Sequence, residues 1–331
     1  YATFPRLSRG FDSHRPLKVG FAMNHIGFMA PCTLCGAGRI QASEHNMSKI
    51  IDGKLIAGKI EKQVAKQVAV LKRRGITPKL AVVMVGEDRP SQIYIKRKKE
   101  AALRVGINLQ TYQFPASIKK ADLIKNINKI QKNKKLSGLI VQLPLPERLY
   151  VPGVLNAIRP EIDVDCLTDA NIGKLVMKTN LIEPPTPWAV IKILKTINFN
   201  LVGKNITLVG AGALVGKPLA IMLINELASV TTCNSHTKNI KKKCQEADVV
   251  VSAVGKKDLI TADMIKKGAV VIDTGIVYDN GKMRGDVNFE SVSKKAGFIT
   301  PTPGGIGPIT VAKLLLNTAT CAKNLNQILY K

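Results

Sequence analysis

Tyr94 and Lys98 are the residues whose types and spacing first indicate chemistry. They stand four positions apart in a predicted helix, so their side chains share one face just past the strand predicted at 80–85. Gln142 ends another apolar run, where a polar amide needs a hydrogen-bond partner. Because open α/β sheets place ligands at the carboxyl ends of their strands, the three side chains are expected to converge.

The alternative interpretation of this helix is a solvated basic face, because Lys98 belongs to the basic run Lys96–Lys99. Asp163 and Asp165 add carboxylates between the two halves of the chain. After residue 46 the sequence has a single histidine, His236, and shows no Ser-His-Asp, Cys-His or metal-ligand arrangement. We therefore expect a reaction that depends on lysine and tyrosine, without a metal ion.

A glycine loop predicts a nucleotide site. Gly210, Gly212 and Gly216 directly follow the strand predicted at 205–209 and open a helix. The first glycine permits a tight turn, and the second lets the backbone approach a pyrophosphate at the helix N-terminus. The last spacing is one residue longer than the usual dinucleotide fingerprint, so a simple packing turn remains the alternative.

The residues after the next predicted strand, 229–233, indicate which dinucleotide binds. The fingerprint places an acidic residue there, which holds the ribose 2′-hydroxyl of NAD. Here Ser235, Thr237 and Lys238 follow the strand, and no acid is present. Hydroxyls and a cation favour a 2′-phosphate, so the sequence predicts NADP, with NAD as the alternative.

The elements that must position these residues alternate between strand and helix. Strands predicted at 80–85, 108–114 and 138–142 are separated by helical segments, which predicts a βαβαβ unit and an open parallel sheet. A second series of elements follows the proline-rich segment at 183–187. Its predicted strands are 205–209, 229–233, 249–253, 269–273 and 298–300, and its helices are 188–197, 217–227 and 310–329.

Composition bounds the class of protein. The 331 residues suggest about two domains, and 45% hydrophobic with 22% charged residues excludes a disordered or fibrous chain. No apolar run approaches the ~20 residues of a membrane span. The net charge of +27 is spread along the chain and comes mainly from lysine, with 5% aromatic residues for stacking on bases. We therefore expect a basic surface that attracts anionic small molecules, and neither nucleic acid nor membrane as a partner.

Residues 1–46 differ from the rest of the sequence. They lack periodicity and carry Arg6, Arg9, Arg15 and Arg39 against two acids, which suggests a leader or extension ahead of Met47. The pair Cys32 and Cys35 has no second pair and no nearby histidine, so no zinc site is expected. The scattered cysteines indicate a reducing compartment: the cytoplasm, or the mitochondrial matrix if residues 1–46 are a transit peptide.

With these motifs in hand, the chain resembles the bifunctional methylenetetrahydrofolate dehydrogenase/methenyltetrahydrofolate cyclohydrolase family from about residue 49 to 331. Several long motifs occur in the family's order, which makes the resemblance far more specific than a glycine loop. They are Ile-Ile-Asp-Gly-Lys at 50–54, Ser-Gln-Ile-Tyr-Ile-Lys-Arg-Lys at 91–98, Gly-Leu-Ile-Val-Gln-Leu-Pro-Leu-Pro at 138–146, Asp-Val-Asp at 163–165, Val-Ile-Asp-Thr-Gly-Ile at 271–276, Gly-Asp-Val at 285–287 and Pro-Thr-Pro-Gly-Gly-Ile-Gly-Pro-Ile-Thr-Val-Ala at 301–312.

The resemblance implies a role for each matched residue. Tyr94 matches the tyrosine that stacks along the aminobenzoate ring of folate, and Lys98 matches the catalytic lysine. Gln142 matches the glutamine that hydrogen-bonds this lysine, and Asp165 the aspartate that holds the pterin. The segment 303–310 matches the loop that closes over folate and nicotinamide. Within this segment the expected substrate contacts are Pro303, Gly304 and Gly305. Elsewhere in the chain, the expected cofactor contacts are Gly210, Ala211, Gly212, Gly216, Ser235, Thr237, Lys238, Gly275 and Ile276.

Two positions depart from the family's pattern. The glycine loop of the family usually contains Gly-Arg-Ser, whose arginine helps to bind the NADP phosphate, whereas this chain has Gly210-Ala211-Gly212. The residue after Asp-Val-Asp is usually glycine and is Cys166 here. The first departure is expected to reduce the preference for NADP over NAD. The second is expected to shift the pterin pocket slightly.

The resemblance also implies an architecture and a mechanism. Two open-sheet α/β domains would flank a cleft: a folate-binding catalytic domain at 47–164 plus 303–331, and a Rossmann-type NAD(P)-binding domain at 165–302. A buried Lys98 oriented by Gln142 would have a lowered pKa and act as a general base on water. The substrate would be a folate, with or without a polyglutamate tail, and the enzyme a homodimer formed through the cofactor domain.

Overall fold

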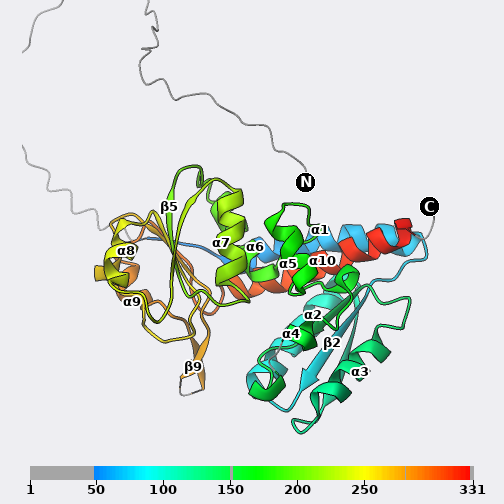
Figure 1. The fold of residues 1–331 in the computed structure, drawn as a ribbon. Coiled ribbons are helices and arrows are strands. Elements are labelled where there is room, and N and C mark those ends of the chain that lie inside the picture. Colours follow the sequence, from blue (N-terminus) through cyan, green and yellow to red (C-terminus); the bar gives the residue numbers. More distant parts are fainter. Residues whose placement is uncertain (1–47, 150–151, 280, 329–331) are drawn as a thin grey trace, which may run out of the picture. The chain divides into compact units, whose positions relative to one another are not determined.

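The computed structural model describes residues 48–149, 152–279 and 281–328, and the expected extension at 1–46 lies outside them. Within these residues, helices and strands alternate around two parallel sheets (Figure 1). The α/β class with open parallel sheets, predicted from the apolar runs, is confirmed. No helix in the described residues is both long and apolar enough to span a membrane.

The first sheet has three strands in the order β3-β2-β4: β2 (Lys79–Val85), β3 (Asn108–Phe114) and β4 (Gly138–Val141). The strands are parallel, so a crossover must connect each strand to the next. The helices α2 (Arg89–Val105) and α3 (Lys120–Ile130) form these two crossovers. The side chain of Asp88 caps α2 by accepting a hydrogen bond from Ser91 N at 2.9 Å, and Gly106 ends it with φ of +79°. These two caps fix where the Tyr94–Lys98 face lies.

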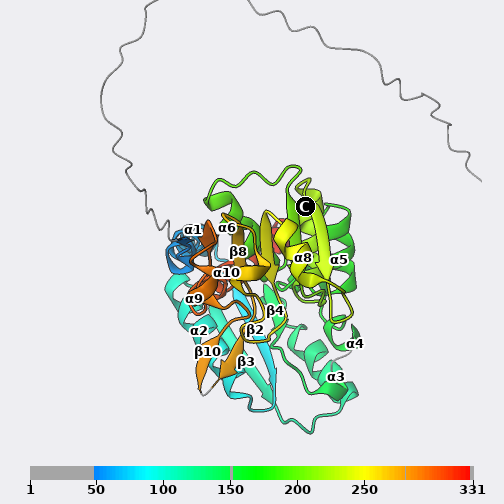
Figure 2. The same ribbon diagram turned by 90° about the vertical axis from the view of Figure 1, so that its left-hand side faces the viewer.

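The second sheet has six parallel strands in the order β1-β11-β8-β7-β5-β6. The central strands are almost purely apolar because they are covered on both faces. The strands are β1 (Lys49–Ile50), β5 (Asn205–Val209), β6 (Ser229–Cys233), β7 (Val249–Ser252), β8 (Val270–Asp273) and β11 (Phe298–Ile299). The helices that follow them include α7 (Gly216–Asn225), α8 (Ile240–Glu246) and α9 (Phe289–Val292). Figure 2 shows the same elements from the side.

Long helices join the two sheets. The helices α1 (Gly53–Arg73) and α10 (Ile306–Ile328) lie side by side, and α10 also contacts α6 (Pro185–Thr196) and α2 (Figure 1). One continuous apolar core includes Val82 of β2, Leu314 of α10 and Ile206 of β5. The boundaries at 164/165 and 302/303 stay a prediction, because α10 packs against helices on both sides of them.

Several short elements were not predicted. The helices α4 (Pro152–Leu155), α5 (Asp169–Val176), α8 and α9 have four to eight residues, too few to show a clear period. Single turns of 3-10 helix at Glu147–Leu149, Pro160–Ile162 and Ala262–Met264 were missed for the same reason. The antiparallel hairpin β9 (Val277–Asp279) and β10 (Lys282–Arg284) was also missed, since its strands have only three residues each. Finally, α10 begins at Ile306 rather than at the predicted residue 310.

Candidate active site

A cavity of about 840 Å³ lies at the carboxyl ends of β2, β4 and β8, a volume typical of small-molecule sites. It brings together most of the residues that the sequence and the resemblance singled out. These are Tyr94, Lys98, Gln142, Asp165, Gly275, Ile276, Pro303, Gly304 and Gly305. Leu214 and Val215, at the end of the glycine loop, also line it, so the cavity reaches the predicted nucleotide site.

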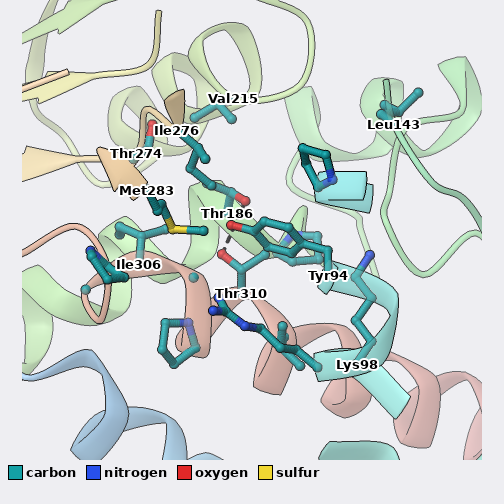
Figure 3. Close-up of a pocket in the computed structure, with 18 of the residues that line it drawn as sticks. Tyr94, Lys98, Leu143, Thr186, Val215, Thr274, Ile276, Met283, Ile306 and Thr310 are labelled. Carbon is teal, nitrogen blue, oxygen red and sulfur yellow. Dashed lines mark hydrogen bonds between the residues drawn. The ribbon is translucent and has the colours of Figure 1, made fainter. Parts of the chain in front are cut away.

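Tyr94 and Lys98 project from α2 into this cavity (Figure 3). Lys98 is buried, with 9% of its surface exposed, so the predicted alternative of a solvated basic face does not apply to it. The hydroxyl of Tyr94 reaches the first turn of α10, where a Cβ placed on Gly307 would lie 3.7 Å from it. Burial raises the pKa of Tyr94, and the nearby phenol of Tyr278 adds to this rise. Tyr94 is therefore a neutral aromatic wall of the cavity.

Lys98 donates a hydrogen bond from Nζ to Oε1 of Gln142 at 3.0 Å. The amide nitrogen of Gln142 donates in turn to the carbonyl of Leu143 at 2.7 Å, which turns Oε1 toward the lysine. Burial lowers the pKa of Lys98, and the negative charge of Asp165 opposes this effect. The structure thus holds an oriented lysine whose neutral form is easier to reach than that of an exposed lysine.

Asp163 and Asp165 have different environments. Asp163 is buried, and its carboxylate accepts hydrogen bonds from Leu167 N at 3.0 Å, Thr168 N at 2.9 Å and Asn171 Nδ2 at 3.0 Å. It therefore organises the turn. Asp165 lines the cavity instead. Burial raises its pKa to about 6; the charge of Lys98 opposes this rise and that of Asp163 adds to it. Asp165 is the carboxyl group available to a ligand.

Cys166 adopts φ of +57°, in the left-handed region that favours glycine. This backbone requirement gives a physical reason for the glycine that the family pattern has at this position. The Cys166 side chain is fully buried in the core, and its Sγ lies 3.7 Å from the carbonyl oxygen of Ile182. It is not among the residues that line the cavity.

The segment that leads into α10 forms one wall of the cavity. Gly304 has φ of +108°, and a Cβ on Gly53 would lie 1.7 Å from the carbonyl oxygen of Gly305, so these backbones touch. Thr186 and Thr310, which also line the cavity, share a hydrogen bond of 3.3 Å, drawn in Figure 3. The start of α6 is thereby attached to the start of α10.

The glycine loop has the shape that a dinucleotide phosphate requires. Gly210 has φ of +111°, and a Cβ there would lie 2.3 Å from the carbonyl oxygen of Ala253. A Cβ on Gly216 would lie 1.9 Å from the carbonyl oxygen of Gly210, so only glycine lets β5 and α7 approach so closely. A Cβ on Gly212 meets nothing within 4 Å, which leaves the loop open to a ligand at the N-terminus of α7.

Ser235, Thr237 and Lys238 do not line the cavity. They lie at the end of β6, next to the glycine loop, because Gly210 N donates to the carbonyl of Cys233 at 2.9 Å. The Thr237 hydroxyl accepts a hydrogen bond from Asn234 N at 2.8 Å and so helps to form the turn. The predicted cofactor residues therefore divide into two groups, one along the glycine loop and one within the cavity.

The predictions from sequence missed two buried carboxylates at the carboxyl ends of the strands of the second sheet. Asp273 accepts hydrogen bonds from the backbone N–H groups of Gly275, Asp286 and Val287 at 3.0–3.1 Å. Asp286 accepts from Ser252 Oγ at 2.8 Å and Val254 N at 2.7 Å. Burial raises the pKa of Asp273 to about 6, against the effect of these backbone donors. The available signal was an acid that ends a buried apolar strand.

Known protein families match both halves of the chain. The model of the tetrahydrofolate dehydrogenase/cyclohydrolase catalytic domain matches residues 51–165, and that of the corresponding NAD(P)-binding domain matches residues 184–326. The bifunctional protein FolD of Moorella thermoacetica is 45% identical over 277 residues, covering 83% of this chain and 99% of the relative. That of Bacillus subtilis is 43% identical, covering 83% and 97%.

Solved structures give the same result. The bifunctional enzyme FolD of Campylobacter jejuni has a TM-score of 0.81 at 38% identity, covering 84% of this chain and 99% of that one. The Trypanosoma brucei methylenetetrahydrofolate dehydrogenase-cyclohydrolase, solved with NADP and an inhibitor, has a TM-score of 0.81 at 36% identity, covering 84% and 98%. The similarity thus spans both sheets and the cavity between their strand ends.

Proposed function

The chain belongs to the tetrahydrofolate dehydrogenase/cyclohydrolase family, and we propose that the cavity lined by Tyr94 and Lys98 carries both of its reactions. The enzyme oxidises 5,10-methylenetetrahydrofolate to 5,10-methenyltetrahydrofolate with NADP⁺ and hydrolyses the product to 10-formyltetrahydrofolate. The observation that carries the site assignment is the hydrogen bond of 3.0 Å between Lys98 Nζ and Gln142 Oε1 inside the cavity.

In the dehydrogenase reaction the protein mainly positions its substrate, which for two reactants is a large effect. Asp165 holds the pterin, and the ring of Tyr94 lies along the aminobenzoate, leaving the bridging carbon near Lys98. The NADP⁺ cofactor, when bound, accepts the hydride from that carbon. A charged lysine would repel the cationic methenyl product, so the lowered pKa of buried Lys98 favours this step.

In the cyclohydrolase reaction Lys98 acts as the general base. Water attacks the bridging carbon of the methenyl group, a C–O bond forms, and Lys98 Nζ takes the water proton. The bond from this carbon to N5 then breaks and its electron pair remains on N5, which takes the proton from Lys98. The hydroxyl on the carbon releases its remaining proton to solvent, which leaves the formyl C=O on N10. Gln142 keeps the lysine oriented through both steps, because its own amide is fixed on Leu143.

The residues that would hold NADP are those of the glycine loop and of the turn after β6. Gly210, Gly212 and Gly216 leave the N-terminus of α7 free for the pyrophosphate, and Ser235 and Lys238 lie beside it for the 2′-phosphate. Gly275 and Ile276 line the cavity next to the reacting carbon and would face the nicotinamide. The close backbone contacts of the loop, which a Cβ would abolish, support this assignment.

The finer features of the partners remain part of this proposal. A homodimer is supported by exposed apolar side chains where α5 and α7 end: Val176, Met177, Leu181, Ile224 and Leu227. These helix ends adjoin, since Asn225 Nδ2 donates to the carbonyl of Leu175 at 3.2 Å. The excess of basic residues suits a folate with a polyglutamate tail. A cytoplasmic location fits four cysteines that are free and buried: Cys166, Cys233, Cys244 and Cys321.

Replacing Lys98 tests the assignment. The variant Lys98→Ala is expected to lose cyclohydrolase activity and most dehydrogenase activity while still binding NADP, because the cofactor residues are untouched. The two activities are followed by the absorbance of methenyltetrahydrofolate and of NADPH. Lys99→Ala is the matched control, since Lys99 is the next residue of α2 and is exposed. Hydrolysis of methenyltetrahydrofolate by Lys98→Ala at the wild-type rate would show that another group is the base.

A further inference from the structure

The β9–β10 hairpin brings two side chains to the cavity that neither the sequence nor the resemblance singled out. Tyr278 and Met283 are paired across its antiparallel strands, and both line the cavity. Figure 3 shows Met283 on the side of the cavity opposite α2, facing Tyr94. The hairpin thus forms a second wall against the helix that carries the reactive lysine.

The base of this hairpin is rigidly held. Both of its legs bond to one buried carboxylate, because Asp273 accepts from Gly275 N before β9 and from Asp286 N after β10. The fit is close on both legs: a Cβ on Gly275 would lie 2.0 Å from Asp286 Oδ1, and one on Gly285 would lie 1.8 Å from Asp273 Oδ2. The backbone at the base of the hairpin is therefore held in place before any ligand arrives.

The hydroxyl of Tyr278 has an unusual environment. Its Oη is buried and has no hydrogen-bond partner among the described residues. Buried hydroxyls in native proteins are almost always paired, because leaving one unpaired costs its hydration. Since Tyr278 lines the cavity, a turn of its side chain brings Oη to the cavity surface, where a ligand supplies the partner that Oη lacks. Tyr278 also lies near Tyr94, because its phenol contributes to the raised pKa of Tyr94.

We propose that Tyr278 binds the substrate by donating a hydrogen bond from Oη to the amide carbonyl that joins the aminobenzoyl ring to glutamate. This inference rests on the proposed function, which gives the pterin to Asp165, the bridging carbon to Lys98 and the aromatic ring to Tyr94. A group that faces Tyr94 from the hairpin lies beside the ring and its attached amide. The amide carbonyl is the acceptor attached directly to that ring, whereas the glutamate carboxylates lie farther along the tail. The hairpin and α2 then hold the substrate between them.

The variant Tyr278→Phe removes Oη and keeps the ring. The KM values for methylenetetrahydrofolate and for methenyltetrahydrofolate are expected to rise about three- to tenfold, the range of one neutral hydrogen bond. The kcat values and the KM for NADP⁺ should stay unchanged, because neither the base nor the cofactor loop is altered. Tyr112→Phe serves as the matched control, since Tyr112 lies on β3 and packs on the core of the first sheet.

Fragment inhibitors locate the contact. Para-aminobenzoyl-glutamate should inhibit Tyr278→Phe less strongly than the wild type by a similar factor, whereas a tetrahydropterin without the tail should inhibit both equally. Unchanged KM values in an active Tyr278→Phe, or a fall in kcat alone, would overturn the inference. So would a lowered melting temperature with a parallel rise in the KM for NADP⁺, which would mark Tyr278 as a structural residue. A wild-type protein inactive in both assays would refute the proposed function instead.

Discussion

The ionised carboxylate of Asp165, which we propose binds the pterin, is expected to lower the free energy of unfolding of the enzyme. Burial raises its pKa from 3.8 to about 6, so the ionised form is disfavoured in the folded protein. Each tenfold change in proton affinity corresponds to about 1.4 kcal/mol, so this rise amounts to at most about 3 kcal/mol. Partial exposure at the cavity wall and the attraction to Lys98 reduce the effect, and about 1–3 kcal/mol is the range to test.

The variant Asp165→Asn replaces the carboxylate with an amide of nearly the same shape. Between pH 4 and 6 the folded wild type keeps a proton that the unfolded chain has lost, so its stability falls as the pH rises through this window. The asparagine side chain does not ionise. The variant should therefore match the wild type near pH 4 and exceed its free energy of unfolding by about 1–3 kcal/mol above pH 7.

Urea unfolding of both proteins at several pH values measures this difference. Glu87→Gln is the control, because it makes the same chemical change at an exposed residue that does not line the cavity. The same Asp165→Asn protein should show a raised KM for methylenetetrahydrofolate. If the difference in free energy of unfolding does not grow between pH 4 and 7, burial of the ionised Asp165 carboxylate does not destabilise the folded protein, and the argument is refuted.

Two further predictions concern regions outside the cavity. Ala211→Arg should raise the ratio of kcat/KM for NADP⁺ over that for NAD⁺ by about tenfold. Hydrogen bonds to a charged group contribute about 1.5–3 kcal/mol, and the lower end of this range applies because the loop is partly solvated. Ala213→Arg, on the same loop, should leave the ratio unchanged, and a clear NAD⁺ preference in the wild type would contradict the cofactor assignment. Deleting residues 1–46 should leave both activities intact, since every matched motif begins after Met47; a soluble but inactive product would show that the segment is required.

The regular elements could be predicted from sequence wherever local signals are strong. The strands at 205–209 and 229–233 were placed at their observed bounds because each is an apolar or β-branched run next to a turn. Tyr94 and Lys98 were found because their spacing of four is a property of one helix. Gln142 could be added because parallel strands end at a common edge, a general rule that needs no knowledge of distances.

The missed residues are those whose role depends on partners far away in the sequence. Tyr278 and Met283 sit on strands of three residues, which carry no usable period. Asp286 acts through backbone groups 32 and 30 positions earlier, at Val254 and Lys256. A carboxylate in such a network looks like any other acid in the sequence, because what distinguishes it is burial among donors that only the folded chain assembles.

The geometry of the site also depends on contacts between residues that are distant in the sequence. Tyr94 and Lys98 lie on α2 and Gln142 follows β4 of the first sheet, whereas the hairpin and the glycine loop extend from strands of the second sheet. Their separation therefore depends on what joins the sheets. That connection is the shared core of α1, α6 and α10, together with the partly buried ion pair of 2.7 Å between Lys313 of α10 and Glu183. Lys313 also lies 4.6 Å from the ring centre of Trp188 on α6. Because α10 begins at the cavity wall and ends far from it, the same helix sets both the packing of the core and the position of the loop at 303–305. Reactive residues close in sequence can thus be recognised locally, while the distance from lysine to cofactor is a property of the whole core.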